Sequence, residues 1–69
     1  MPLMIAPLNQ PIKVVKILAD EKTKKHLESL GITINSVIEV VSNSSSIVLK
    51  IKEGRLAIDR DLASRIVVA

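Results

Sequence analysis

The chain has 69 residues, a formal net charge of +3, no cysteine and no aromatic residue. This length allows one domain with a small core and argues against a deep, closed active site. Without cysteine the chain can build no disulfide framework, thiolate zinc site, iron–sulfur cluster or thiol nucleophile. Without aromatic rings it lacks the groove that binds proline-rich peptides and the stacking surfaces that bind single-stranded nucleic acid.

Residues 1–11 contain all three prolines and predict an irregular lead-in, with Leu3 and Leu8 anchored on the core. The apolar run at the start of this segment is far shorter than the ~20 residues that span a bilayer. No basic segment precedes it, so we expect a cytoplasmic protein with no direct membrane insertion. Residues 12–17 are rich in Val and Ile and predict a strand. Their apolar positions change phase, which indicates either a bulge or burial on both faces.

Residues 20–30 predict the one helix of the chain, with Asp20 as its N-cap. Gly31 follows directly and is expected to end the helix with a positive φ. We expect Leu30 to be buried with Leu49 of a later strand. The narrow apolar stripe of the helix consists of Ala19, Thr23, Leu27 and Leu30.

The rest of the chain predicts four short strands, at residues 37–41, 47–52, 55–59 and 65–68. Their connections are a turn at 34–36, a polar loop at 42–46, a tight turn at Glu53-Gly54 and a helical turn at 60–64. About five strands with one short α-helix between the first two predict an all-β fold. The pattern favours a small closed barrel, formed as a single domain by residues 1–69, because closure removes exposed sheet edges.

The sequence contains few residues that could catalyse a reaction or bind a metal ion. Two glycines cannot build a phosphate-binding loop. His26, the one histidine, has no serine or carboxylate partner at a useful spacing. Asp59 and Asp61 could share an ion at a strand end, but solvent exposure and capping of the next turn explain them better. We therefore expect no enzyme activity, no metal site and no cofactor.

A basic helix face is the strongest candidate for a binding site. Lys22, Lys24 and Lys25 lie off the apolar stripe, so they are expected to form an exposed partner-binding surface for an acidic protein. A merely solvated face is the alternative. A second basic group on one predicted hairpin is explained by protection of a strand edge against aggregation, and it consists of Lys50, Lys52 and Arg55.

The order of these segments resembles the ferrous-iron transport protein A (FeoA) family over essentially the whole chain. The most specific parts are the helix end Leu30-Gly31-Ile32 and the strand Leu56-Ala57-Ile58 with Arg60 and the Ala63 turn. The other matching segments are Leu3 with Ala6-Pro7, Leu27-Glu28-Ser29, Val37-Ile38-Glu39-Val40-Val41, Ile47-Val48-Leu49-Lys50-Ile51 and Ile66-Val67-Val68. Where the family commonly has Pro-Gly after the helix, this chain has Ile34-Asn35, and asparagine can supply the same backbone shape.

The resemblance implies an SH3-like barrel and a non-enzymatic cytoplasmic accessory that binds and modulates the FeoB-type membrane ferrous-iron transporter. It supplies no metal ligand or catalytic residue that maps onto this chain. Two alternatives stay open. One is a nucleic-acid-binding small barrel, which the net charge allows but the missing aromatic residues disfavour. The other is a stand-alone metal-responsive domain like that of iron-dependent repressors. The absence of a preceding helix-turn-helix favours the transport accessory.

Overall fold

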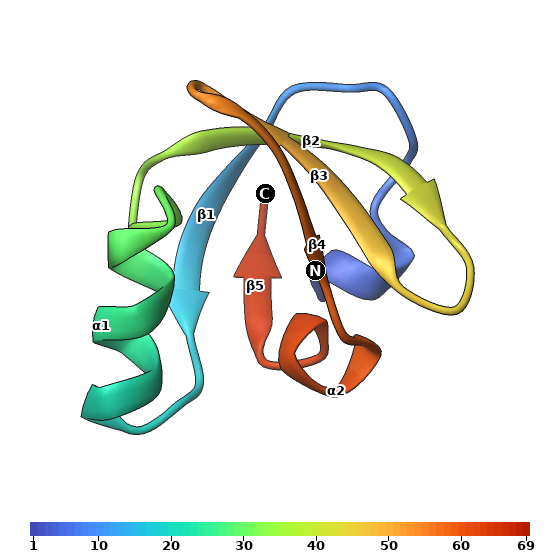
Figure 1. Ribbon diagram of the computed structural model, residues 1–69. Coiled ribbons are helices and arrows are strands. Elements are labelled where there is room, and N and C mark those ends of the chain that lie inside the picture. Colours follow the sequence, from blue (N-terminus) through green and yellow to red (C-terminus); the bar gives the residue numbers. More distant parts are fainter.

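Five antiparallel strands form one curved sheet with the order β4-β3-β2-β1-β5 (Figure 1). The computed structural model describes all of residues 1–69. Its elements are η1 (Leu3–Ile5), β1 (Ile12–Ile17), α1 (Glu21–Ser29), β2 (Val37–Asn43), β3 (Ile47–Ile51), β4 (Gly54–Ile58), α2 (Arg60–Ala63) and β5 (Ile66–Val68). The predicted all-β fold, with its one short helix between the first two strands, is confirmed. No helix is long and apolar enough to cross a membrane.

The sheet curls round so that β5 lies under the layer of β2, β3 and β4 (Figure 1). The predicted closure is incomplete, because β4 and β5 stand at opposite ends of the strand order and do not pair with each other. The chain passes between them through α2. The outer edge of β5 is instead occupied by the start of the chain: Met1 N donates to Val68 O and Val68 N donates to Met1 O, both at 2.7 Å.

The core is entirely apolar, with no buried polar or charged residue. Ile47 and Leu49 of β3 are both 0% exposed, as their alternation predicts. Leu3 is fully buried, but the prediction for Leu8 is wrong, because that side chain is 49% exposed. The backbone rather than the side chain holds this segment on the sheet: Leu8 bridges to Val40, and Asn9 N donates to Val40 O at 2.7 Å.

A bulge in β1 explains the change of apolar phase. The pairing of β1 with β5 shifts register between Val14 and Lys16. The extra residue leaves Val14 and Ile17 both buried, while Val15 is 41% exposed. The strand is therefore bulged, and it is not buried on both faces.

Both ends of α1 follow the predicted capping. The Asp20 carboxylate accepts a 2.9 Å bond from the Thr23 backbone amide. Hydrogen bonding from the Thr23 side chain, then from its backbone amide, lowers the pKa of Asp20 below its ordinary value of 3.8. At the other end Gly31 has φ +98°, which confirms its predicted conformation. Ile32 N donates to Leu27 O and Gly31 N donates to Glu28 O, the paired bonds of a Schellman motif.

Fewer residues of α1 are buried than its apolar stripe predicts. Leu27 is the one fully buried residue of α1. Leu30 is only partly buried, so its assignment to the core is wrong. It occupies the C-cap position and lines a groove between the end of α1 and the β3–β4 hairpin, where it faces solvent on one side.

Two loops differ from their predicted boundaries. Strand β2 continues to Asn43, where the predicted loop already began at residue 42. The β3–β4 turn consists of Lys52 and Glu53, one residue earlier than predicted, because Ile51 pairs with Gly54. Neither turn residue has a positive φ. The residue with a positive φ is Gly54, at +138°. The turn at 34–36 is confirmed, with φ +72° at Asn35.

Candidate partner-binding surface on helix α1

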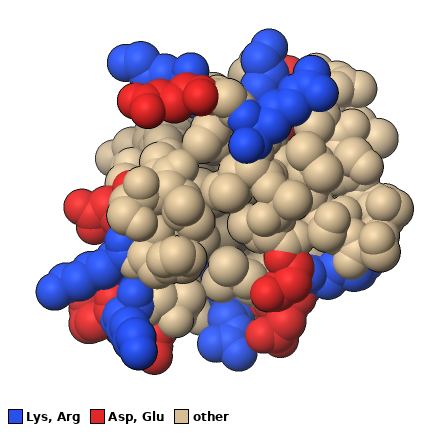
Figure 2. Space-filling model, viewed as in Figure 1, with Lys and Arg blue, Asp and Glu red and all other residues tan.

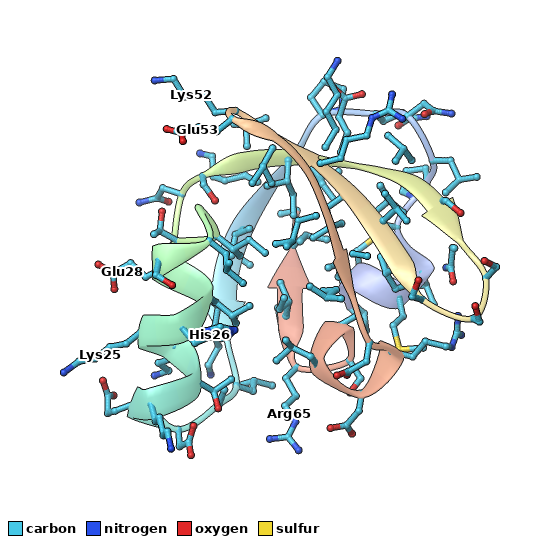
Figure 3. All side chains as sticks on the ribbon, in the orientation of Figure 1. Lys25, His26, Glu28, Lys52, Glu53 and Arg65 are labelled. Carbon is cyan, nitrogen blue, oxygen red and sulfur yellow. The ribbon has the colours of Figure 1, made fainter.

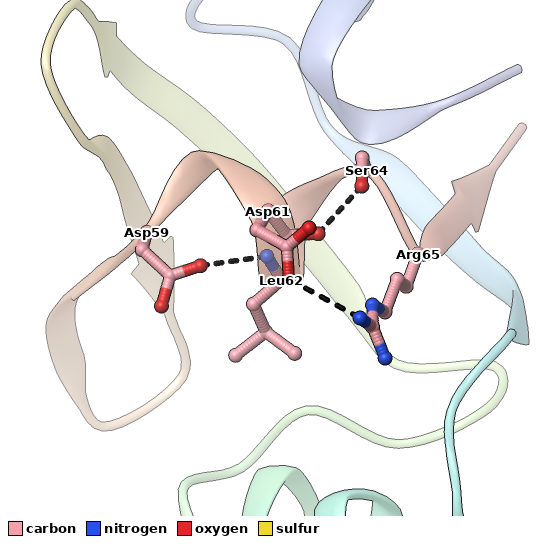
Figure 4. A network of polar contacts seen from close by, with 5 residues as sticks. All are labelled: Asp59, Asp61, Leu62, Ser64 and Arg65. Carbon is pink, nitrogen blue, oxygen red and sulfur yellow. Dashed lines mark hydrogen bonds and ion pairs between the residues drawn. The ribbon is translucent and has the colours of Figure 1, made fainter.

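The candidate metal ligands do not come together. No group of three or more His, Asp or Glu side chains is placed to hold an ion. Asp59 caps α2 by accepting a 2.7 Å bond from Leu62 N, and Asp61 accepts a 3.2 Å bond from Arg65 (Figure 4). His26 is exposed on α1. Both aspartates therefore have the capping and surface roles that their sequence context favours.

Titration of the purified chain with Fe²⁺ or Mn²⁺ under anaerobic conditions is expected to show no saturable site at low micromolar concentration. Either ion needs several oxygen or imidazole ligands on one site, and this chain offers isolated ones. Isothermal calorimetry checks the prediction. A tight one-to-one isotherm that disappears in His26→Ala would contradict it.

The three predicted lysines all lie on the surface, but acidic residues accompany them. Lys22 and Lys25 are exposed, and the Lys24 ammonium lies 3.8 Å from the Glu21 carboxylate. This pair is solvent-exposed and contributes about 0–1 kcal/mol at most. Figure 3 shows Lys25 and Glu28 pointing away from the body of the molecule. Basic and acidic side chains are accordingly interspersed over α1 at the lower left of Figure 2.

A groove of about 490 Å³ between α1, β1 and residues 32–34 brings two of the lysines together with apolar surface. We call it the α1–β1 groove. Lys24 and Lys25 line it from the helix and Lys16 from the strand, while Lys22 does not line it. Val15 and Ile34, which are 41% and 50% exposed, supply its apolar part. Exposed apolar side chains rimmed by polar or charged ones are typical of surfaces that bind other proteins.

The charges of the α1–β1 groove favour an acidic partner. Three lysines line it against two glutamates, Glu21 and Glu28. A second groove, of about 590 Å³, lies between the end of α1 and the β3–β4 hairpin. Acidic residues outnumber basic ones in this second groove, because one lysine, Lys52, lines it together with Glu28 and Glu53. The α1–β1 groove is therefore the better match to the predicted basic surface.

The sequence predicts two of the three lysines that line this groove, Lys24 and Lys25, but neither Lys16 nor the apolar part. Val15 lies beside the bulge in β1, which turns its side chain outward. The change of apolar phase in residues 12–17 is the sequence signal for that bulge. Ile34 falls in the predicted turn at residues 34–36. An apolar residue at the start of a turn gives no direct sign of whether it faces the core or solvent.

A protein-family model described as the FeoA domain matches residues 1–69. A crystal structure of an iron uptake regulatory protein (FeoA) superposes with a TM-score of 0.88 at 29% identity, covering 99% of this chain and 92% of that one. The solution structure of a FeoA-like protein from Clostridium acetobutylicum gives 0.83 at 19% identity, covering 100% and 84%. No curated protein matches the chain significantly.

A likeness in fold extends to part of a longer protein. The crystal structure of ScaR with bound Zn²⁺ superposes with a TM-score of 0.88 at 14% identity, covering 99% of this chain and 35% of that one. Identity this low shows a shared fold alone. Together these structures confirm the SH3-like barrel that the resemblance implies.

Proposed function

The chain belongs to the FeoA domain family, and from that membership we propose that it is a cytoplasmic accessory of a ferrous-iron transport system. It binds the cytoplasmic portion of the FeoB-type membrane transporter and modulates transport. The observation that carries the proposal is the match of the family model to the whole chain. The chain acts by binding and not by catalysis; nucleotide hydrolysis and ion passage belong to the transporter.

The α1–β1 groove is the surface proposed to meet the transporter. Its lysines attract an acidic surface at long range, and Lys22 adds to that attraction from the neighbouring helix face. Once the two proteins touch, burial of Val15 and Ile34 stabilises the complex by removing apolar area from water. Exposed charges at the rim of such a contact act mainly on the association rate.

Replacing Lys24 and Lys25 together by glutamate is expected to weaken binding to the transporter's cytoplasmic portion roughly tenfold at low salt. Folding should be preserved, since surface substitutions usually change stability by no more than about 0.5 kcal/mol. The measurement is surface-immobilised binding at two salt concentrations. The parent chain should lose affinity as salt rises, and the double variant should respond less.

The matched control is Lys13→Glu with Lys52→Glu, which changes the net charge equally but lies outside the groove. It should bind nearly as the parent does. Equal weakening by both double variants would mean that overall charge, and not this groove, drives binding. If the parent chain fails to bind the transporter and instead binds DNA in a salt-dependent way, the proposed function itself is wrong.

A further inference from the structure

Strand β4 has an outer edge that no other strand covers, because β4 ends the strand order of the sheet. Its inner edge pairs with β3 through a two-residue turn, with Ile51 opposite Gly54 and Lys50 opposite Arg55. In an antiparallel pair, hydrogen-bonded and non-hydrogen-bonded residue pairs alternate. The pair nearest the turn is hydrogen-bonded, so the backbone N–H and C=O groups of Arg55 and Ala57 point outward.

These outward groups of Arg55 and Ala57 have no partner elsewhere in the chain. No backbone bond from a turn or loop reaches them, and no side chain donates to them or accepts from them. Both residues are exposed. In Figure 1, β4 crosses the front of the molecule. A strand edge of this kind is a template for pairing with another extended chain.

The other end of the sheet is closed to such pairing. Met1 and Pro2 occupy the outer edge of β5 through the Met1–Val68 bonds and the Pro2–Val67 bridge. A chain or ring of copies joined through β4 of one and β5 of the next would need both edges free. The remaining occupants of the β4 edge are a second copy, related by a two-fold axis, and an extended segment of another protein.

The charges beside the edge decide between these occupants. Glu39, Lys50 and Arg55 form one cross-strand row over β2, β3 and β4. Neither Lys50 nor Arg55 takes part in an ion pair of the structure. Lys50 nevertheless has Glu39 opposite it on β2, whereas Arg55 has no strand on its outer side. In a two-fold pair centred on Arg55, two arginines would lie opposite each other and repel. In a pair centred on Ala57, Asp59 would lie opposite Arg55, but the Asp59 carboxylate already caps α2. An acidic side chain on an added strand would complete the row.

We infer that the outer edge of β4 binds an extended acidic segment of a partner protein by strand addition. An acidic residue lies opposite Arg55, and a larger apolar residue two positions away covers the small side chain of Ala57. The backbone groups of Arg55 and Ala57 supply the hydrogen bonds. This edge is distinct from the α1–β1 groove, and the inference does not depend on the identity of the transporter.

A synthetic peptide of seven residues, Glu-Thr-Val-Thr-Glu-Thr-Val, is the probe, because residues two positions apart share one face of a strand and so present Glu and Val together. The full chain is its target. Binding is followed by ¹⁵N-resolved NMR, which reports every backbone amide separately. We expect the Arg55 and Ala57 amides to shift and to exchange with solvent more slowly when the peptide is bound. The same peptide with Lys in place of Glu should bind much more weakly.

Two modifications separate strand addition from simple charge attraction. N-methylation of the two peptide amides that face β4 should weaken binding roughly 30-fold, because two hydrogen bonds are lost. N-methylation of the alternate amides, which face away, leaves the charge and the bonds intact and serves as the control. In the protein, Arg55→Glu should weaken binding roughly fivefold or more, whereas Lys52→Glu, off the charge row, should have a smaller effect.

Three results would overturn the inference. Both N-methylated peptides could bind equally well, which would make the contact purely electrostatic. The shifted amides could lie on α1 and β1 instead of β4, which would place the peptide in the groove. The free chain could form a dimer in sedimentation with the Arg55 and Ala57 amides already protected, which would make a second copy the occupant.

Discussion

Replacing Leu49 by alanine is expected to lower the free energy of unfolding by about 2–5 kcal/mol. The side chain is 0% exposed and points into the core from the middle of β3. Its cross-strand neighbours are Val40 on one side and Leu56 on the other, so truncation removes contacts with both adjacent strands. A chain with a net stability of about 5–15 kcal/mol loses a large fraction of it.

Urea denaturation of the parent and the variant measures this loss. Leu30→Ala is the matched control, because it removes the same atoms from a side chain that is only partly buried. Its cost should be clearly smaller. A loss below about 1 kcal/mol at Leu49 would contradict the packing described for β3.

The second large effect is expected at Gly31, where valine should destabilise the chain by about 1–3 kcal/mol through backbone strain alone. The residue has φ +98°, a conformation that β-branched residues avoid. An added Cβ would also lie 3.4 Å from Ile51 Cδ1, so the branched methyl groups would meet the β3–β4 hairpin. Thermal unfolding followed by circular dichroism would record the change.

Gly31→Asn is the control for this prediction, because asparagine tolerates a positive φ better than other residues. It should be less destabilising than valine, even though its side chain is of similar size. If the two variants unfold at the same temperature, crowding against Ile51 outweighs the backbone conformation. If valine costs nothing, the helix end differs from the Schellman arrangement described above.

Local sequence patterns predict most of the fold. Alternation defines β3, and Asp20 with Gly31 defines α1, because each signal depends on residues close in sequence. The errors arise where distant residues decide. Strand β2 continues to Asn43 because its register shifts after Val40, so that Asn43 pairs with Ile47. The Asn43 side chain also donates to Met4 O at 2.8 Å and accepts from Arg60 at 2.6 Å. No local pattern contains that information.

The charged part of the candidate site can be predicted from the sequence, whereas its apolar part cannot. The positions of Lys24 and Lys25 off the apolar stripe follow from helical periodicity, and the structure places both on one groove. The apolar half of the groove depends on how far α1 stands from β1. It also depends on the bulge after Val14, which leaves Val15 exposed. The periodicity of helices and strands predicts neither the width of this groove nor which residues line it.

The pairing of β1 with β5 also has a consequence for the order in which the molecule assembles. The β3–β4 hairpin closes around two residues, whereas Ile17 meets Ile66 from about fifty residues away. Closing the longer loop costs more chain entropy, and that cost comes before its contacts can offset it. The β3–β4 hairpin can therefore form early in folding, whereas β1 pairs with β5 only after the long intervening segment has been closed into a loop.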